Sequence, residues 1–172
     1  LWELHQGRLR AAALASRDVA DLARIWGGAL RLGGEAGQAG VRATILSDLA
    51  ELERLGVPED LPALTILRAS YEQIGDPAGV ARTEERLLSL HPCSRESRQV
   101  RSMKLAAERE TASRSPDRER LAWLGRALAE IDSALERCPG DESLLFQRIG
   151  LLRDAPEERN AELLAAVDRW LA

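Results

Sequence analysis

Residues that favour β-strands are scarce in this chain. Valine, isoleucine and threonine are few, and phenylalanine and tyrosine occur once each. These are the side chains that cover the pleated face of a sheet. Alanine, leucine, glutamate and arginine dominate instead, and they lose little conformational freedom on entering a helix. The composition therefore predicts an all-α fold.

Cysteine and histidine are also scarce, with two of each and no CxxC or HExxH motif. His5 and His91 stand far apart, so the sequence predicts neither a metal site nor a cofactor. Cys93 and Cys138 each flank a helix-closing proline, at what read as equivalent places of successive hairpins. This placement predicts that the two sulfurs lie too far apart to bond. The alternatives are a disulfide, or a reactive Cys93 thiol at a helix N-terminus.

Sequence motifs of enzymes are lacking as well. There is no GxSxG motif, and the paired carboxylates Glu84-Glu85 and Glu157-Glu158 are neighbours that point apart on a helix. We therefore expect no catalytic residue. No apolar run reaches the length of about 18 residues that a transmembrane helix needs. The sequence begins at Leu1 in helical-looking sequence, which we interpret as a fragment, so its compartment, cytoplasmic or periplasmic, stays open.

The charge balance has no basic excess. With 24 basic and 28 acidic residues the net charge is −4, which argues against a nucleic-acid partner. All basic residues except Lys104 are arginine, as in a GC-rich bacterial genome; selection for arginine contacts is the alternative. Arg95, Arg98 and Arg101 recur every three residues and predict a basic stripe. It is either a solvated face or a docking surface for an acidic segment of a partner.

Apolar residues spaced by three or four, together with capping residues, predict about nine helices. Four glycines in residues 33–40 predict a break in an otherwise single domain of residues 1–172, and a sub-boundary there. Four tryptophans are expected mostly as core anchors: Trp2, Trp26, Trp123 and Trp170. The predicted helices cover residues 1–15, 18–32, 41–55, 61–74, 77–90, 94–112, 116–137, 142–153 and 156–171.

Residues 61–92 resemble a tetratricopeptide repeat. Large apolar residues occupy the family's packing positions, a Gly-Asp pair lies at the turn, and a proline closes the unit; these residues are Leu64, Leu67, Tyr71, Gly75, Asp76, Leu87, Leu88 and Pro92. The sequence departs from the pattern at Arg68, where the family prefers a small residue, at Val80, where it usually has alanine, and at Glu84, where it has an aromatic residue. A second, partial match covers residues 127–171. The resemblance implies a right-handed stack of antiparallel helical hairpins.

The resemblance also implies a function, a non-catalytic scaffold that holds a protein or peptide on a concave surface. One alternative is a helical accessory or dimerisation region of a larger, exported enzyme, for example a redox enzyme. Another is self-association through an apolar face. Carried onto this chain, the family's groove positions fall on Thr65, Ala69, Glu72, Gln73, Gln99, Met103, Phe146 and Arg153.

Overall fold

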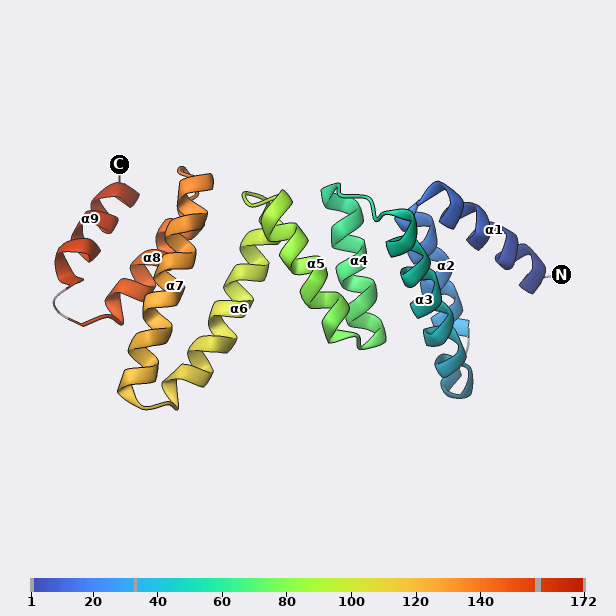
Figure 1. The fold of residues 1–172 in the computed structure, drawn as a ribbon, viewed down its shortest axis with the longest axis horizontal. Coiled ribbons are helices and arrows are strands. Elements are labelled where there is room, and N and C mark those ends of the chain that lie inside the picture. Colours follow the sequence, from blue (N-terminus) through green and yellow to red (C-terminus); the bar gives the residue numbers. More distant parts are fainter. Residues whose placement is uncertain (1, 33, 157–158, 172) are drawn as a thin grey trace. The chain divides into compact units, whose positions relative to one another are not determined.

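Nine α-helices and no strand make up the part of the chain that the structure describes (Figure 1). This computed structural model describes the backbone of residues 2–32, 34–156 and 159–171, and the side chains in these ranges except those of residues 2–6 and 34–38. The all-α prediction is confirmed, and the predicted ranges hold except at the starts of α3 and α9. The helices are α1 (Trp2–Ser16), α2 (Val19–Leu32), α3 (Gly34–Leu55), α4 (Leu61–Ile74), α5 (Pro77–Leu90), α6 (Arg95–Ser113), α7 (Asp117–Arg137), α8 (Glu142–Arg153) and α9 (Asn160–Leu171).

The chain forms two compact units, Leu1–Leu90 and His91–Ala172. Each unit has its own hydrophobic core. The core of the first is centred on Leu22, Trp26, Leu49, Leu52 and Leu67, and that of the second on Leu128, Ile131, Ala134, Leu144 and Leu152. Within each unit helices pack on their neighbours, as a helical stack requires. We expected one domain with a sub-boundary at residues 33–40, but the division falls between Leu90 and His91.

The glycine-rich stretch is helical, contrary to our prediction of a break. Residues 34–40 form the first turns of α3, and Gly33 lies outside the described residues. Each glycine costs about 1 kcal/mol relative to alanine in a helix. Extending an existing helix costs far less than starting one, however, and α3 is anchored by buried Ile45, Leu49 and Leu52. Good helix formers also separate the glycines, so the helix continues through them.

Helices α4 and α5 form an antiparallel hairpin whose ends carry strong local signals (Figure 1). The Asp60 side chain caps α4 by accepting a hydrogen bond from the backbone of Ala63 at 2.9 Å. Gly75 ends the helix with φ = 73°, a left-handed conformation that favours glycine. In α5, Gly79 lies against the Tyr71 ring, because a Cβ added there would come within 2.5 Å of the ring. The sequence therefore fixes both the turn and the close approach of the two helices.

Helices α6 and α7 form a longer hairpin in the second unit, and α8 and α9 follow it. Ser94 caps α6 through the backbone of Ser97, and Asp141 caps α8 through the backbone of Ser143 and Leu144. Helix α7 begins after Pro116 without a side-chain cap, and the nearby hydroxyl of Ser115 donates to the carbonyl oxygen of Thr111 at 3.4 Å. The start of α6 and the end of α7 lie at the same end of the hairpin, since the Cα atoms of Cys93 and Cys138 are 5.6 Å apart.

Candidate functional site

The predicted groove residues of α4 lie on its solvent face. Thr65, Ala69, Glu72 and Gln73 are all exposed, whereas Leu64, Leu67 and Tyr71 on the opposite side are buried. The Thr65 hydroxyl donates to the carbonyl oxygen of Leu61 within the same helix at 2.8 Å. None of the four side chains belongs to the hydrophobic core of the first unit. Their exposure makes this face accessible to a partner.

An ion pair joins α4 to α5 next to this face. Arg68 Nε donates to Glu84 Oε1 at 2.9 Å, and a second nitrogen of Arg68 lies 3.5 Å from Glu72 Oε2. Side-chain exposure is 19% for Arg68 and 9% for Glu84, so the pair is largely removed from water. The guanidinium thus reaches from the interior to an exposed groove residue.

A tyrosine network lies at the other side of the same hairpin. The Tyr71 hydroxyl donates to Glu53 Oε1 on α3 at 2.8 Å, and Arg82 Nη2 donates to the same oxygen at 3.2 Å. The Arg82 guanidinium also lies 5.8 Å from the centre of the Tyr71 ring. Burial, and then the hydrogen bond to Glu53 and its charge, raise the pKa of Tyr71 to about 12, while Arg82 acts in the opposite direction. The network ties α3, α4 and α5 together.

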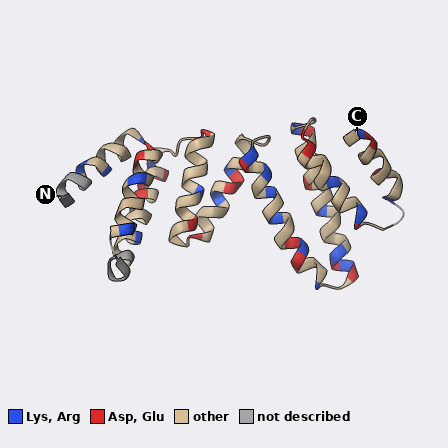
Figure 2. Ribbon diagram, turned by 180° about the vertical axis from the view of Figure 1, so that it is seen from behind, with Lys and Arg blue, Asp and Glu red and all other residues tan. Residues whose placement is uncertain are grey.

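The three arginines of α6 do not form a continuous basic stripe, which corrects our prediction. Arg95 is exposed, Arg98 is half-buried and lies 3.4 Å from Asp141 Oδ2, and Arg101 is only 1% exposed. Each step of three residues falls about 60° short of a full turn, so two steps carry the row from solvent into the core. Acidic residues also occur along this helix (Figure 2). With Arg101 buried and Arg98 paired with Asp141, the three arginines give little support for a partner with an acidic segment.

Arg101 is buried and holds the backbone of a neighbouring segment. Its Nη1 donates to the carbonyl oxygen of Pro92 at 3.1 Å, which holds the segment before α6. Burial lowers the pKa of the Arg101 guanidinium, and the positive charge of Arg137 lowers it further, while Glu130 and Asp141 oppose this. Gln99 and Met103, the predicted groove residues of the same helix, are both exposed. The exposed residues of α6 thus include polar and apolar side chains as well as charges of both signs.

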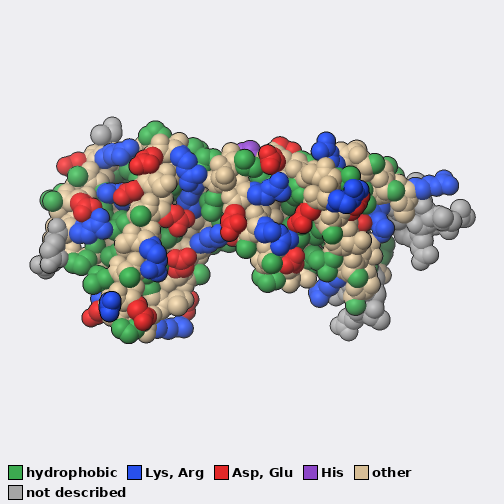
Figure 3. Space-filling model, in the orientation of Figure 1, with side chains coloured by type: hydrophobic (Ala, Val, Ile, Leu, Met, Phe, Trp, Pro, Cys, Tyr) green, Lys and Arg blue, Asp and Glu red, His purple; other side chains and the backbone are tan. Residues whose placement is uncertain are grey.

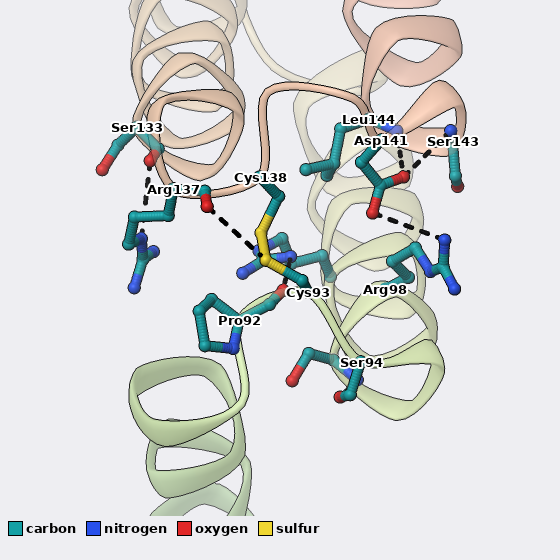
Figure 4. Close-up of a disulfide and its surroundings, with 12 residues drawn as sticks. Pro92, Cys93, Ser94, Arg98, Ser133, Arg137, Cys138, Asp141, Ser143 and Leu144 are labelled. Atoms are coloured by element: carbon teal, nitrogen blue, oxygen red, sulfur yellow. Dashed lines mark hydrogen bonds and ion pairs between the residues drawn. A yellow bond between two sulfur atoms is a disulfide. The ribbon is translucent and has the colours of Figure 1, made fainter.

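Cys93 and Cys138 form a disulfide, which corrects our prediction that they lie too far apart (Figure 4). Cys93 directly precedes the cap of α6, and Cys138 directly follows α7. They lie side by side at the open end of one long hairpin, not at equivalent places of two successive hairpins, and their Cα atoms are 5.6 Å apart. The sequence held a signal for this, because Pro92 and Pro139 bracket a single extended unit. No thiol is left to act as a nucleophile among the residues that the structure describes.

An exposed aromatic pair lies on the last two helices. Phe146 of α8 is 65% exposed and Trp170 of α9 is 44% exposed, and their ring centroids are 6.4 Å apart. Phe146 was a predicted groove residue, and so was Arg153, which is also exposed. Trp170 was expected in the core instead; Trp26 and Trp123 are buried as predicted, and the Trp2 side chain lies outside the described residues. The sequence gives no signal that separates Trp170 from the buried tryptophans, since its helix has apolar residues on more than one face.

Hydrophobic side chains reach the surface among charged ones in the space-filling view (Figure 3). In the first unit a cavity of about 1080 Å³ lies among α1, α2 and α3. Near it Trp26 Nε1 donates to Asp48 Oδ2 at 2.9 Å, and Arg10 Nε lies 3.4 Å from the other oxygen of this buried carboxylate. In the second unit a notch of about 570 Å³ between α6 and α7 includes Trp123, whose Nε1 donates to Glu108 at 3.1 Å.

Within residues 2–32, 34–156 and 159–171, histidine, cysteine and carboxylate side chains do not gather in any group of three or more that could hold a metal ion. The helices described there include none that combines the length and the apolar character needed to cross a bilayer.

Comparisons with known proteins give no match. No protein-family model fits the chain, and neither a curated protein nor a solved structure is significantly similar to it.

Proposed function

We propose that this chain is a non-catalytic protein-interaction scaffold built from hairpins that resemble tetratricopeptide repeats. One observation carries the proposal. The eight groove residues chosen from the sequence, on α4, α6 and α8, are all exposed, and two of them, Met103 and Phe146, are large apolar side chains. Large apolar side chains that are not needed in a core are typical of protein-binding surfaces. The partner is a protein or peptide, and no cofactor is required.

The test reverses one exposed charge in each unit. In a tagged full-length chain, Glu72→Arg combined with Arg153→Glu should abolish capture of the partner from a native lysate, measured by mass spectrometry. Both side chains are exposed, so helicity measured by circular dichroism should stay unchanged.

A matched control reverses one exposed charge in each unit away from the groove positions. Glu85→Arg combined with Arg118→Glu changes the same number and kind of charges on α5 and α7. Capture that survives in the control and disappears in the groove variant supports the proposal. Equal capture by both variants would remove the groove assignment.

The disulfide favours a second candidate function, an accessory or dimerisation region of a larger exported enzyme. Disulfides persist in oxidising compartments and are rare where thiols are kept reduced. The Cys93–Cys138 bond therefore supports a periplasmic rather than a cytoplasmic location. Alkylation of thiols in intact cells, followed by mass spectrometry, tests the location: unmodified cysteines support it and alkylated ones oppose it. A catalytic domain elsewhere in the full gene product would favour this second function.

A further inference from the structure

Trp170, which contacts Phe146, has a different environment from the other tryptophans whose side chains the structure describes. Trp26 and Trp123 are buried, and each indole N–H donates to a carboxylate, that of Asp48 or that of Glu108. The indole of Trp170 donates to no group in the described residues, and nearly half of the residue faces solvent. Trp170 therefore presents both a ring face and an unused donor to whatever binds there.

A carboxylate lies about one helical turn from Phe146. Glu142 precedes Phe146 by four residues on α8, so the two side chains share one face of the helix about one turn apart. Glu142 is exposed, and no ion pair holds it within the part of the chain that the structure describes. Its charge is thus available to a ligand that rests on the aromatic rings.

The sequence around the aromatic pair also has a negative net charge. Residues 127–172 carry ten acidic and five basic side chains, a net charge of −5. Of the basic groups near the pair, Arg169 is held by the carbonyl oxygen of Pro139 at 3.2 Å. Arg153 lies seven residues beyond Phe146, about 10 Å along the helix axis. Arg169 and Arg153 keep their positive charges, but the acidic residues of this segment outnumber its basic ones by five, so the segment as a whole favours a cation over an anion.

We propose that Phe146, Trp170 and Glu142 dock a basic side chain, arginine or lysine, of a partner protein. The cation stacks on the electron-rich ring faces while the carboxylate meets its charge, a combination that neither group provides alone. The indole N–H is free to donate to a backbone carbonyl of the same partner segment. This inference rests on the proposed scaffold function and adds the chemistry of the partner. Its sign is opposite to that of the acidic segment, which was one of the two alternatives for the α6 arginines.

A second copy of the chain is the less favoured occupant. Pairing this surface with the same surface of a second copy would bring two regions of net charge −5 together, and like charges facing each other oppose association. Nuclear magnetic resonance together with sedimentation distinguishes a basic partner segment from self-association.

The experiment follows the indole N–H resonance of Trp170 by nuclear magnetic resonance in the full-length chain, assigned by its loss in Trp170→Phe. The probes are two capped pentapeptides, Gly-Leu-Arg-Leu-Gly and Gly-Leu-Glu-Leu-Gly. The arginine peptide should shift the resonance saturably, and the glutamate peptide at the same concentration should not. An exposed cation–π contact corresponds to a change in Kd of about two- to fivefold, so Phe146→Ser and Glu142→Gln should each weaken binding by about that factor.

Matched controls lie elsewhere in the second unit. Leu121 has the same exposed fraction as Trp170, 44%, and Glu136 is another exposed carboxylate. Leu121→Ser and Glu136→Gln should leave the Kd of the arginine peptide unchanged. Equal shifts with both peptides, or no shift with either, would overturn the inference. A resonance that moves with protein concentration, together with dimers in sedimentation, would assign the surface to a second copy instead.

The two proposals fail separately. If the arginine peptide does not bind but the Glu72→Arg, Arg153→Glu variant still loses its partner, the scaffold function stands and the partner chemistry is wrong. If the peptide binds but partner capture is unaffected by that variant, the aromatic site stands and the groove assignment is wrong.

Discussion

Arg68 and Glu84 contact each other across the α4–α5 hairpin, with 2.9 Å between Nε and Oε1. Residues 61–92 resemble the tetratricopeptide pattern but differ from it at three positions; Arg68 and Glu84 are two of them, and Val80 is the third. The pattern has a small and an aromatic residue at the first two positions. Here these two side chains form an ion pair with each other, so α4 and α5 keep a direct side-chain contact at this place.

Breaking this pair should destabilise the first unit, and replacing both partners should restore it. Arg68→Ala removes the guanidinium partner of a buried carboxylate and should lower the free energy of unfolding by about 1–3 kcal/mol. Arg68→Ala combined with Glu84→Phe installs a small and an aromatic residue and should recover most of the loss, since apolar replacements of buried ion pairs are often neutral or stabilising. Urea unfolding measures both.

Glu72→Ala is the control for this cycle, because it removes the exposed carboxylate of the same arginine. It should change the free energy of unfolding by less than about 0.5 kcal/mol. Additive losses in the double variant, with no recovery, would show that the pair does not replace an apolar contact.

Two glycines in helices should respond in opposite ways to the same substitution. Gly79→Ala places a Cβ into the Tyr71 ring and should destabilise the first unit by about 1–3 kcal/mol. Gly125 in α7 has no atom within 4 Å of an added Cβ, so Gly125→Ala should stabilise the second unit by about 0.5–1 kcal/mol. Denaturant unfolding of both variants checks the signs, and a neutral Gly79→Ala would disprove the close packing.

Tyr71 is the only tyrosine in the chain, so tyrosinate absorbance reports on it alone. Its pKa should be near 12 in the folded protein, against an ordinary value of 10.0. Glu53→Gln removes the neighbouring negative charge and should lower this pKa, although burial keeps it above the ordinary value. An unchanged titration in Glu53→Gln would contradict the role of Glu53.

The same shift predicts the direction of alkaline destabilisation. Below pH 10 the tyrosine is protonated in both the folded and the unfolded state, and its full contribution to stability is present. As the pH rises towards 12 the unfolded chain loses the proton first, so stability falls over this range. Tyr71→Phe cannot lose a proton, and its stability should fall less between these pH values.

Removing the disulfide should destabilise the second unit. Cys93 and Cys138 are 45 residues apart, and closing a loop of this size stabilises a folded chain by about 4 kcal/mol in the chain-entropy description. The Cys93→Ser, Cys138→Ser variant should therefore unfold at a lower urea concentration than the oxidised protein and match the reduced protein. A reductant that leaves the midpoint of the oxidised protein unchanged would show that the bond does not stabilise this unit.

The sequence predicts the helices well, because their ends are fixed locally by residues such as Asp60, Gly75 and Asp141. It fails where contacts distant in the chain decide. The helix through residues 34–40 depends on the packing of the rest of α3 against other helices, and the sequence does not show which side of α6 faces the core and buries Arg101. Trp170 has the same residue type as the buried tryptophans, and only the position of α9 leaves it exposed.

The bond between Cys93 and Cys138 turns residues 93–138 into a covalent ring that includes the exposed turn at Arg114. A protease that cuts once after Arg114 would open the ring but would not divide the molecule. The two halves of the hairpin would remain tethered at the opposite end, at a high effective concentration for reassembly. After a single cleavage at the tip the two fragments therefore stay covalently joined, and they separate only when the disulfide is reduced.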